Sequence, residues 1–365
     1  MEQKRVLGLL GLASVAGAYM YGASLEVIIF IAAMAFFQNV AYGLQSRARM
    51  RDSNLYHIIA MFLASGVFFA TFRYLTINNL PLVLLPAYLV GTCYGTLKGN
   101  NLSQYIENKI GAKVGSIADK GSSQLVRFWP SLIFLVLLII GQSLVGDYSL
   151  KIVLIIAGLS LIDSLGFSIT TITRNANNYT IHYVATFIQV LVKFISLKIL
   201  VEQQMTWYLL LPQMGGGAIG SIVGAEMAKG IVKKFGASFD GHLNKAGKIY
   251  IALPEILFTT LFILPQFYFF GFETIAPVAV LLFAATAQSI SFTNVSRARQ
   301  RKNENYLLWA SIFSNGVWYL TAHLLVVKVL PMYMLIPYTM GTLYGGMIGQ
   351  FVSMQIERMF KIKTE

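Results

Sequence analysis

Polar residues recur at one depth of the predicted membrane-spanning helices, where they could act on a solute. Gln38, Asp163 and Gln288 are spaced 125 residues apart, and each lies about two to three helical turns before an arginine-containing loop. At 1.5 Å per residue, this distance places them inside the hydrocarbon region. An ionisable group at that depth is costly unless it faces a wet cavity or a partner, so Asp163 is a functional candidate. The alternative is hydrogen bonding between helices that holds the structure together.

The next helix of each segment contains a second polar set. Ser65 and Asn315 are equivalent mid-helix positions that could line a path, although Val190 stands at the third equivalent position. Near the outer end of this helix lies a basic or protonatable residue in every copy: Arg73, Lys198 and His323. These three residues predict either a ring of positive charge that favours anions at an outer mouth or side chains that snorkel to outer headgroups.

Arginines in the loops after the first set of helices form a third set. Arg49, Arg174 and Arg299 share the spacing of 125 residues. We expect them to contact anionic lipid headgroups at the inner membrane surface. Because guanidinium groups suit bidentate contacts with oxyanions, an anion site at the cytoplasmic mouth is the other interpretation.

Glycines spaced four residues apart mark a helix-packing face in the last helix of each segment. Spacing by four puts these glycines on one side of a helix, where two backbones can approach closely. We therefore expect close packing, around a threefold axis that can leave a narrow path. The glycines are Gly91, Gly95, Gly99, Gly216, Gly220, Gly224, Gly341, Gly345 and Gly349.

The composition predicts a membrane protein. The chain has 365 residues, of which 56% are hydrophobic and 12% charged, whereas a soluble domain carries roughly a quarter charged residues. About twenty apolar residues cross a bilayer, and charge-free stretches of this length recur at 128–146, 204–225, 274–296 and 306–327. We therefore predict an all-α, polytopic transmembrane protein.

An internal repeat organises these helices. The motif Ser-Arg-Ala-Arg at 46–49 recurs at 296–299, and half of that 250-residue offset finds a middle copy. The sequence predicts three units, over residues 1–115, 116–238 and 239–365. Four helices are expected in each unit, about twelve in all: 5–21, 24–45, 55–76, 80–98, 127–146, 149–172, 179–201, 206–226, 249–270, 274–296, 305–327 and 332–352. Four crossings return the chain to its starting side, so the units are expected to be parallel, with pseudo-threefold symmetry.

The charge pattern predicts the orientation. Lys and Arg favour the cytoplasmic side, and the N-terminus, the arginine loops and the basic tail of each unit fall on one side of this topology. Both termini are therefore expected in the cytoplasm, in a bacterial-type inner or plasma membrane. Topology and anionic lipids then explain the net charge of +13 better than nucleic-acid binding does.

Motifs of catalysis and metal binding are missing from the sequence. It contains no nucleophile–base pair, phosphate-binding loop or metal-ligand spacing, and its four histidines are scattered. Cys93 is the only cysteine, which excludes an intrachain disulfide. We therefore expect no enzymatic activity, no cofactor and no metal.

The predicted third and fourth helices contain several local motifs. These are the basic turn at 296–299, the segment Ser314-Asn315-Gly316-Val317-Trp318, and the run from Pro337-Tyr338 through Gly341, Gly345 and Gly349 to Ile356-Glu357. Through them the hairpin resembles a family of uncharacterised bacterial membrane proteins that share a domain of unknown function. The relatives look like single-unit proteins with a soluble C-terminal domain. The resemblance implies no activity, but it suggests that an ancestral unit assembled as a homotrimer before fusion.

These patterns favour a transporter or channel for a small solute or ion, with basic rings that favour an anion. The alternatives are a non-transporting membrane scaffold, whose polar residues only join helices, and a lipid-handling protein, whose basic loops hold headgroups. A wet cavity that reaches Gln38, Asp163 and Gln288 would favour transport, whereas a dry, packed axis would remove the argument for it. The sequence leaves the oligomeric state open.

Overall fold

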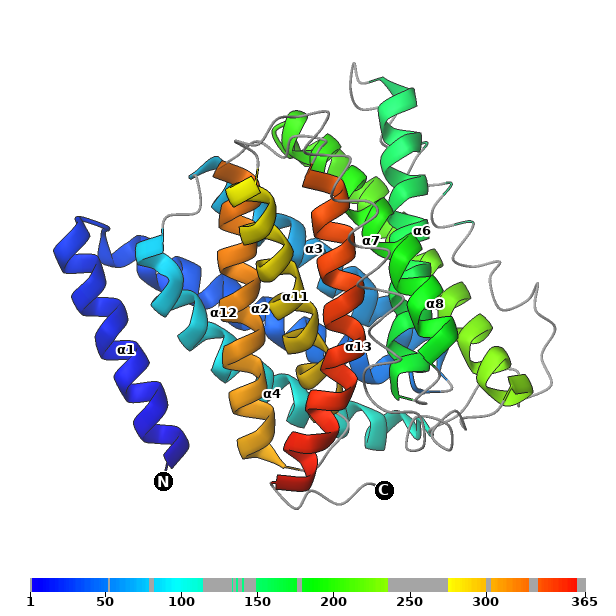
Figure 1. Cartoon of the computed structure of the whole chain (residues 1–365), viewed down its shortest axis with the longest axis horizontal. Helices are drawn as coiled ribbons and strands as arrows, with labels where there is room; N and C mark the ends of the chain where they lie inside the picture. The colour runs from blue at the N-terminus through cyan, green and yellow to red at the C-terminus, as the bar shows by residue number, and fades with distance from the viewer. Residues whose placement is uncertain are drawn as a thin grey trace.

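The fold is helical throughout the part of the chain that the structure describes. The computed structural model describes residues 2–51, 53–78, 82–113, 149–175, 179–235, 275–299, 303–327 and 334–359, together with Ile133, Val136 and Ile140. Within these ranges no strand occurs (Figure 1). The α-helices are α1 (Glu2–Tyr21), α2 (Leu25–Ala48), α3 (Asn54–Ile77), α4 (Leu85–Ile110), α6 (Leu150–Asn175), α7 (Tyr179–Glu202), α8 (Leu210–Phe235), α11 (Ile275–Ala298), α12 (Glu304–Val327) and α13 (Leu335–Met359).

The helices expected from hydropathy are confirmed wherever the structure describes the chain. Those expected at 127–146 and 249–270 lie outside the described residues, apart from three helical positions in the first range. The fourth helices extend further than expected: α4 and α13 reach into the basic tails, to Ile110 and Met359, and α8 continues through its tail to Phe235. A left-handed glycine, Gly111 with a φ of 65°, ends α4, because glycine adopts this conformation without a steric penalty.

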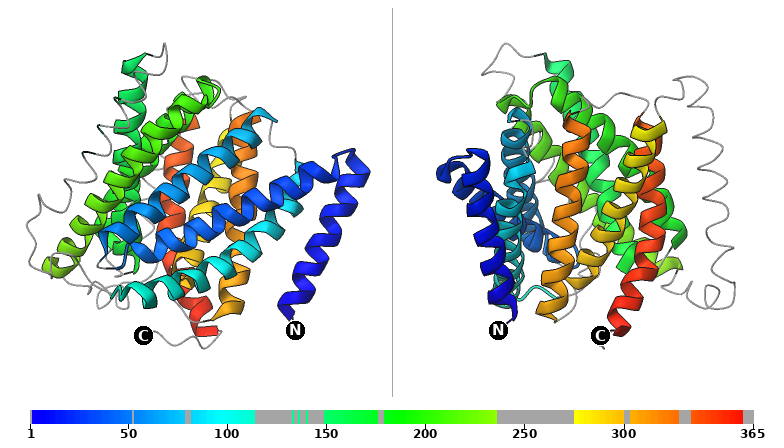
Figure 2. Two further views of the ribbon diagram at one scale, coloured as in Figure 1. Left: turned by 180° about the vertical axis from the view of Figure 1, so that it is seen from behind. Right: turned by 60° about the vertical axis from the view of Figure 1, so that its left-hand side comes forward.

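Several of these helices are suited to a bilayer. Among the described residues, five helical segments are long and apolar enough to cross a membrane: Leu25–Ala48, Leu55–Ile77, Leu150–Thr173, Val184–Glu202 and Ala276–Ala298. They include the helices that carry Gln38, Asp163 and Gln288. The chain is thus a helical protein with several helices compatible with membrane insertion. The beginning of α1 and the end of α13 lie at the same end of the molecule (Figure 2).

The glycine-bearing helices pack against the helices that carry the polar residues. The main contacts join α4 to α2, α8 to α6, and α13 to α11. At the middle of each contact a glycine faces backbone, so that a Cβ atom would meet a carbonyl oxygen: Gly95 with Phe36, Gly220 with Leu161, and Gly345 with Thr286. Only glycine permits so close an approach, and this approach fixes the rotation of each polar helix.

Further contacts join these helix pairs into a closed cycle. Helix α3 packs on α8, α7 packs on α13, and α12 packs on α4 (Figure 1). The contact between α12 and α4 includes an aromatic pair, Tyr88 and Trp318, whose ring centroids lie 5.7 Å apart. The described helices therefore surround a common centre instead of forming a row.

Ion pairs connect the ends of α2 and α11 to their glycine-bearing partners. The Glu107 carboxylate accepts hydrogen bonds from Arg47 at 2.9 and 2.7 Å and from Arg51 at 2.7 Å. Glu357 accepts two from Arg297, at 3.0 and 2.9 Å. Burial alone would raise the pKa of Glu107, but the hydrogen bonds and charges of Arg47 and Arg51 outweigh burial and lower it. Both carboxylates therefore hold the end of α4 or α13 to the end of its partner helix.

The close helix packing predicts that Gly220→Ala lowers the thermal stability of the purified protein. The new Cβ would collide with the Leu161 backbone, and overpacking of this kind costs ~1–3 kcal/mol. Gly158→Ala in α6 is the matched control, because no atom lies within 4 Å of its Cβ position. Thermal unfolding followed by intrinsic fluorescence measures both variants, and equal midpoints would contradict the close packing of α6 on α8.

The ion pairs predict that Glu107→Gln destabilises the protein, because it leaves Arg47 and Arg51 without their carboxylate, and unpairing a buried charge costs ~3–5 kcal/mol. The Glu107 side chain is 6% exposed, whereas Glu202, which pairs with Lys198, is 50% exposed. Glu202→Gln is therefore the control and should change the unfolding midpoint little. The lowered pKa also predicts a pH dependence. The stabilisation contributed by the Glu107 carboxylate is present above the ordinary pKa of glutamate and is lost as pH falls through the lower folded-state pKa, so E107Q should lack this part of the pH dependence. An E107Q midpoint equal to that of E202Q would refute the structural role.

Candidate functional site

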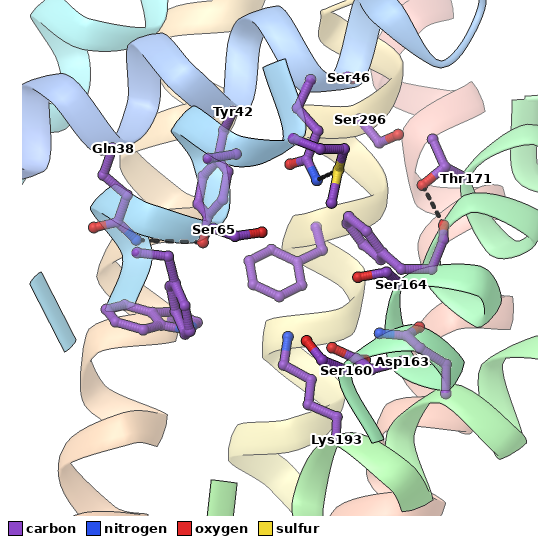
Figure 3. A pocket seen from close by; sticks show the side chains of 18 of the residues that line it. Gln38, Tyr42, Ser46, Ser65, Ser160, Asp163, Ser164, Thr171, Lys193 and Ser296 are labelled. Atoms are coloured by element: carbon purple, nitrogen blue, oxygen red, sulfur yellow. Dashed lines mark hydrogen bonds between the residues drawn. The ribbon is translucent and has the colours of Figure 1, made fainter. Parts of the chain in front are cut away.

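A cavity of about 160 Å³, whose lining includes many polar and charged side chains, lies among the helices of the described structure. Its lining comes from α2, α3, α6, α7, α8, α11 and α12. Figure 3 shows Gln38 and Tyr42 approaching from α2, and Asp163 and Lys193 approaching from α6 and α7. The volume is well above the ~10–15 Å³ that one water molecule needs, so the cavity has room for a small solute.

The helices α2, α6 and α11 line the cavity in layers. Residues at intervals of four, four and three positions lie on one side of a helix, and the same intervals recur on each of these helices. The lining includes an amide or carboxyl layer (Gln38, Asp163), an aromatic layer (Tyr42, Phe167, Phe292), a hydroxyl layer (Ser46, Thr171, Ser296) and an arginine layer (Arg49, Arg299). Members of one layer are separated by 125 residues or a multiple of it.

The third helices α3, α7 and α12 contribute side chains that differ between copies. Ser65 and Asn315 line the cavity, as they must if they lie on a path. The position next to them is Ala64, Gln189 or Ser314, and one helical turn further it is Phe68, Lys193 or Trp318. In both sets the middle copy, on α7, has the larger polar or charged side chain.

Asp163 lies at the side of the cavity formed by α6 and α7. It forms a side-chain hydrogen bond with Gln189 and interacts electrostatically with Lys193 and Arg49. Its Oδ1 atom is buried and has no hydrogen-bond partner among the described residues. Although Lys193 attracts it, the two side chains form no direct ion pair, since no bridge within 4 Å joins these two described residues. The carboxylate is thus only partly compensated.

Arg49 extends into the protein from the end of α2. The residue is 2% exposed, its Nε donates to Ser168 and Ser221 at 3.2 Å each, and its guanidinium lies 4.5 Å from the Phe167 ring centroid. The expectation that Arg49 contacts lipid headgroups is therefore wrong, because two hydroxyls and an aromatic ring hold the side chain inside. The other expectation, an anion site, is compatible with its place in the lining.

Arg299 has the equivalent position after α11 but lacks equivalent partners. Its Nε is buried and has no hydrogen-bond partner among the described residues. The sequence explains the difference, because the residues 125 positions before Ser168 and Ser221 are Gly43 and Thr96. Glycine has no hydroxyl, and the Thr96 hydroxyl is bonded to Ser311 at 2.6 Å. Arg299 also lines the cavity, whereas the side chain of Arg174 lies outside the described residues.

Positive charge predominates around the cavity. Three cationic side chains, Arg49, Lys193 and Arg299, face one carboxylate, Asp163. None of the three cations forms an ion pair within the described structure, although Arg47, Arg51 and Arg297 nearby all do. Uncompensated charge is costly in an interior of low polarity. The cavity therefore has the electrostatic character of an anion site.

Four residues predicted as parts of a path do not line this cavity: Gln288, Arg73, Lys198 and His323. Gln288 forms a side-chain hydrogen bond with Tyr338, which fits the alternative of bonding between helices. Arg73 donates to the backbone carbonyls of Gln204 and Met205 at 3.0 Å each, and its guanidinium lies 5.1 Å from the Trp207 ring centroid. Lys198 pairs with Glu202 on its own helix. Arg73 and Lys198 are thus occupied by contacts within the protein.

Sequence reasoning missed Lys193, Gln189 and Gln213, all of which line the cavity. A signal for Lys193 existed, because it lies in an otherwise apolar segment and its equivalents are Phe68 and Trp318. A search for residues shared by all copies passes over such a position. Gln213 stands where the other copies have Tyr88 and Tyr338. As with Lys193, the difference between copies could have identified the position.

Comparison with known proteins adds no assignment. No family model matches the chain, and neither a curated protein nor a solved structure is significantly similar to it.

Proposed function

We propose that this chain is an integral membrane protein that passes a small solute, preferentially an anion, across the bilayer through the cavity. The observation that carries this proposal is the cluster of Asp163, Lys193, Arg49 and Arg299 around a cavity among helices apolar enough to span a membrane. Ionisable side chains in such helices face water-filled paths or partners, and they mark the routes of solutes and ions. A protein that only joined helices would have no need for a cavity with this excess of cations.

The proposed architecture is three parallel four-helix units around a pseudo-threefold axis, with about twelve membrane-spanning helices and both termini in the cytoplasm. Two features support it. The same close helix contact recurs at glycines 125 residues apart, and the contacts between units close into a cycle. In this arrangement the second helix of each unit faces the axis, which accounts for the layered lining of the cavity.

The layers suggest the order in which a solute meets the protein. From the cytoplasmic side it first meets Arg49 and Arg299, and then the hydroxyls of Ser46, Thr171 and Ser296. The aromatic layer of Tyr42, Phe167 and Phe292 follows, and a narrow apolar layer of this kind can act as a gate. Asp163 and Lys193 lie beyond it. The cations attract an anion, and the single carboxylate opposes a second one.

Lys193→Met is predicted to reduce solute flux in proteoliposomes by about tenfold or more, because a hydrogen bond to a charged group contributes ~1.5–3 kcal/mol. The flux of labelled chloride, phosphate, lactate, serine and glucose is compared with that of empty liposomes. Lys198→Met is the matched control, since Lys198 lies on the same helix but outside the cavity lining. We expect the wild-type protein and K198M to conduct at least one anionic probe at similar rates.

Two results would contradict the proposal. Flux equal to that of empty liposomes for every probe would favour the membrane scaffold. Equal losses in K193M and K198M, in proteins with the same unfolding midpoint, would show that the cavity does not carry the solute.

A further inference from the structure

Four residues that line the cavity have buried polar atoms without a partner. They are the Oδ1 of Asp163, the Oε1 of Gln213, the Oγ of Ser296 and the Nε of Arg299, and none has a hydrogen-bond partner among the described residues. An unmade hydrogen bond at a buried polar group costs ~1–3 kcal/mol, so native proteins satisfy nearly all such groups. Their position around one cavity indicates that molecules inside the cavity, water or a ligand, supply the partners.

The types of these atoms define what the ligand must offer. The Arg299 Nε is a donor and requires an acceptor, and the cationic charge around it favours an anionic one. The Asp163 Oδ1 and the Gln213 Oε1 are acceptors and require donors. A halide supplies no donor, and a neutral polyol supplies no charge. One molecule with both an anionic group and hydrogen-bond donors would satisfy all of these atoms at once.

The middle copy differs from its neighbours at the positions that create this requirement. In the first copy Tyr88 donates to the Gln38 amide oxygen at 3.4 Å, and in the third Tyr338 is hydrogen-bonded to Gln288. The equivalent residues in the middle copy are Asp163 and Gln213. In the middle copy an oxygen of each residue lacks a hydrogen-bond partner among the described residues; the Gln288 Oε1 of the third copy also lacks one, but Gln288 lies outside the cavity lining. The substitution therefore replaces an internal contact with two acceptors for a ligand.

The Arg49 side chain extends from the arginine layer to the aromatic layer, where its guanidinium lies 4.5 Å from the Phe167 ring centroid. Asp163 and Lys193 interact electrostatically without a direct ion pair. The Tyr42 side chain interacts electrostatically with Arg299, Asp163 and Arg49, so its hydroxyl lies within electrostatic range of all three charges. A small molecule beside Tyr42 is therefore within electrostatic range of the carboxylate and of the cations.

We infer that the cavity selects a small organic anion, a carboxylate or a phosphate, that also bears hydroxyl or ammonium groups. The anionic group binds to Arg299, Arg49 and Lys193, and the hydroxyl or ammonium groups donate to Asp163 and Gln213. This inference deepens the proposed function, on which it rests, by naming the class of solute. The cavity of about 160 Å³ suits a molecule of this size.

Binding to the purified protein tests the ligand class without any need for transport. Isothermal titration calorimetry in detergent compares glycerate, glycerol 3-phosphate and serine, which carry both features, with propionate and glycerol, which carry one each. We expect at least one of the first three to bind at least tenfold more tightly than either single-feature probe. The comparison between glycerate and glycerol 3-phosphate distinguishes a carboxylate from a phosphate.

Variants connect the binding to the named atoms. Asp163→Ala should lower the affinity for the tightly bound probe at least tenfold and change the affinity for propionate less than threefold. Arg299→Gln should lower both affinities, and Lys198→Met should leave every affinity unchanged. Equal affinity for the two-feature probes and propionate, or no measurable heat of binding with any probe at 10 mM, would overturn the inference. Both measurements need only the wild-type protein. Tight binding without flux in proteoliposomes would instead overturn transport and leave the ligand class standing.

Discussion

The distance of closest approach between two helix backbones is the constraint on which the rest of the structure depends. Gly95, Gly220 and Gly345 bring the fourth helices so near to α2, α6 and α11 that a Cβ atom would meet backbone. A helix held this closely along one side cannot rotate about its axis, so the direction in which its opposite side faces is also fixed. That other side carries the layers of amide or carboxyl, aromatic, hydroxyl and arginine groups. The ion pairs of Glu107 and Glu357 hold two of the three contacts at their ends.

The common framework makes the differences between the copies interpretable. Packing recurs at equivalent positions, so a residue that changes in one copy is not required by that packing. In the middle copy Asp163, Gln189, Lys193 and Gln213 replace less polar or uncharged residues, and all four line the cavity. Arg49 and Arg299 also differ because of a change between copies. The Ser168 hydroxyl accepts a hydrogen bond from Arg49, whereas the equivalent position for Arg299 is Gly43, which has no hydroxyl. Equivalent packing contacts thus surround a set of polar groups that differs from one segment to the next, which is the arrangement that the proposed recognition of an asymmetric solute requires.

Much of the fold could be predicted from the sequence, because long apolar segments and an offset of 125 residues are visible without a structure. The positions of the described helices followed from hydropathy, although the fourth helices extend past their expected ends. Gln38, Asp163, Ser65 and Asn315 were recognised as candidates that do line the cavity. The inward direction of Arg49 could not be predicted, because Ser168 and Ser221 lie on other helices far along the chain. Arg73 was misjudged for a similar reason, since its partners are loop carbonyls more than a hundred residues away. Lys193 was missed because a comparison of copies draws attention to what they share.

The central claim is that Asp163 and its neighbours line a cavity that admits small anions, and thiol accessibility measures this most directly. Cys93 is the only cysteine and is buried, so a Cys93→Ala background allows single cysteines to be placed at Ser164, which lines the cavity, and at Ser291, which is fully buried outside its lining. In membranes, the S164C thiol should react with an anionic sulfonatoethyl methanethiosulfonate faster than with its cationic trimethylammonium analogue, and S291C should react with neither. Protection of S164C from both reagents, or faster reaction with the cation, would contradict the account.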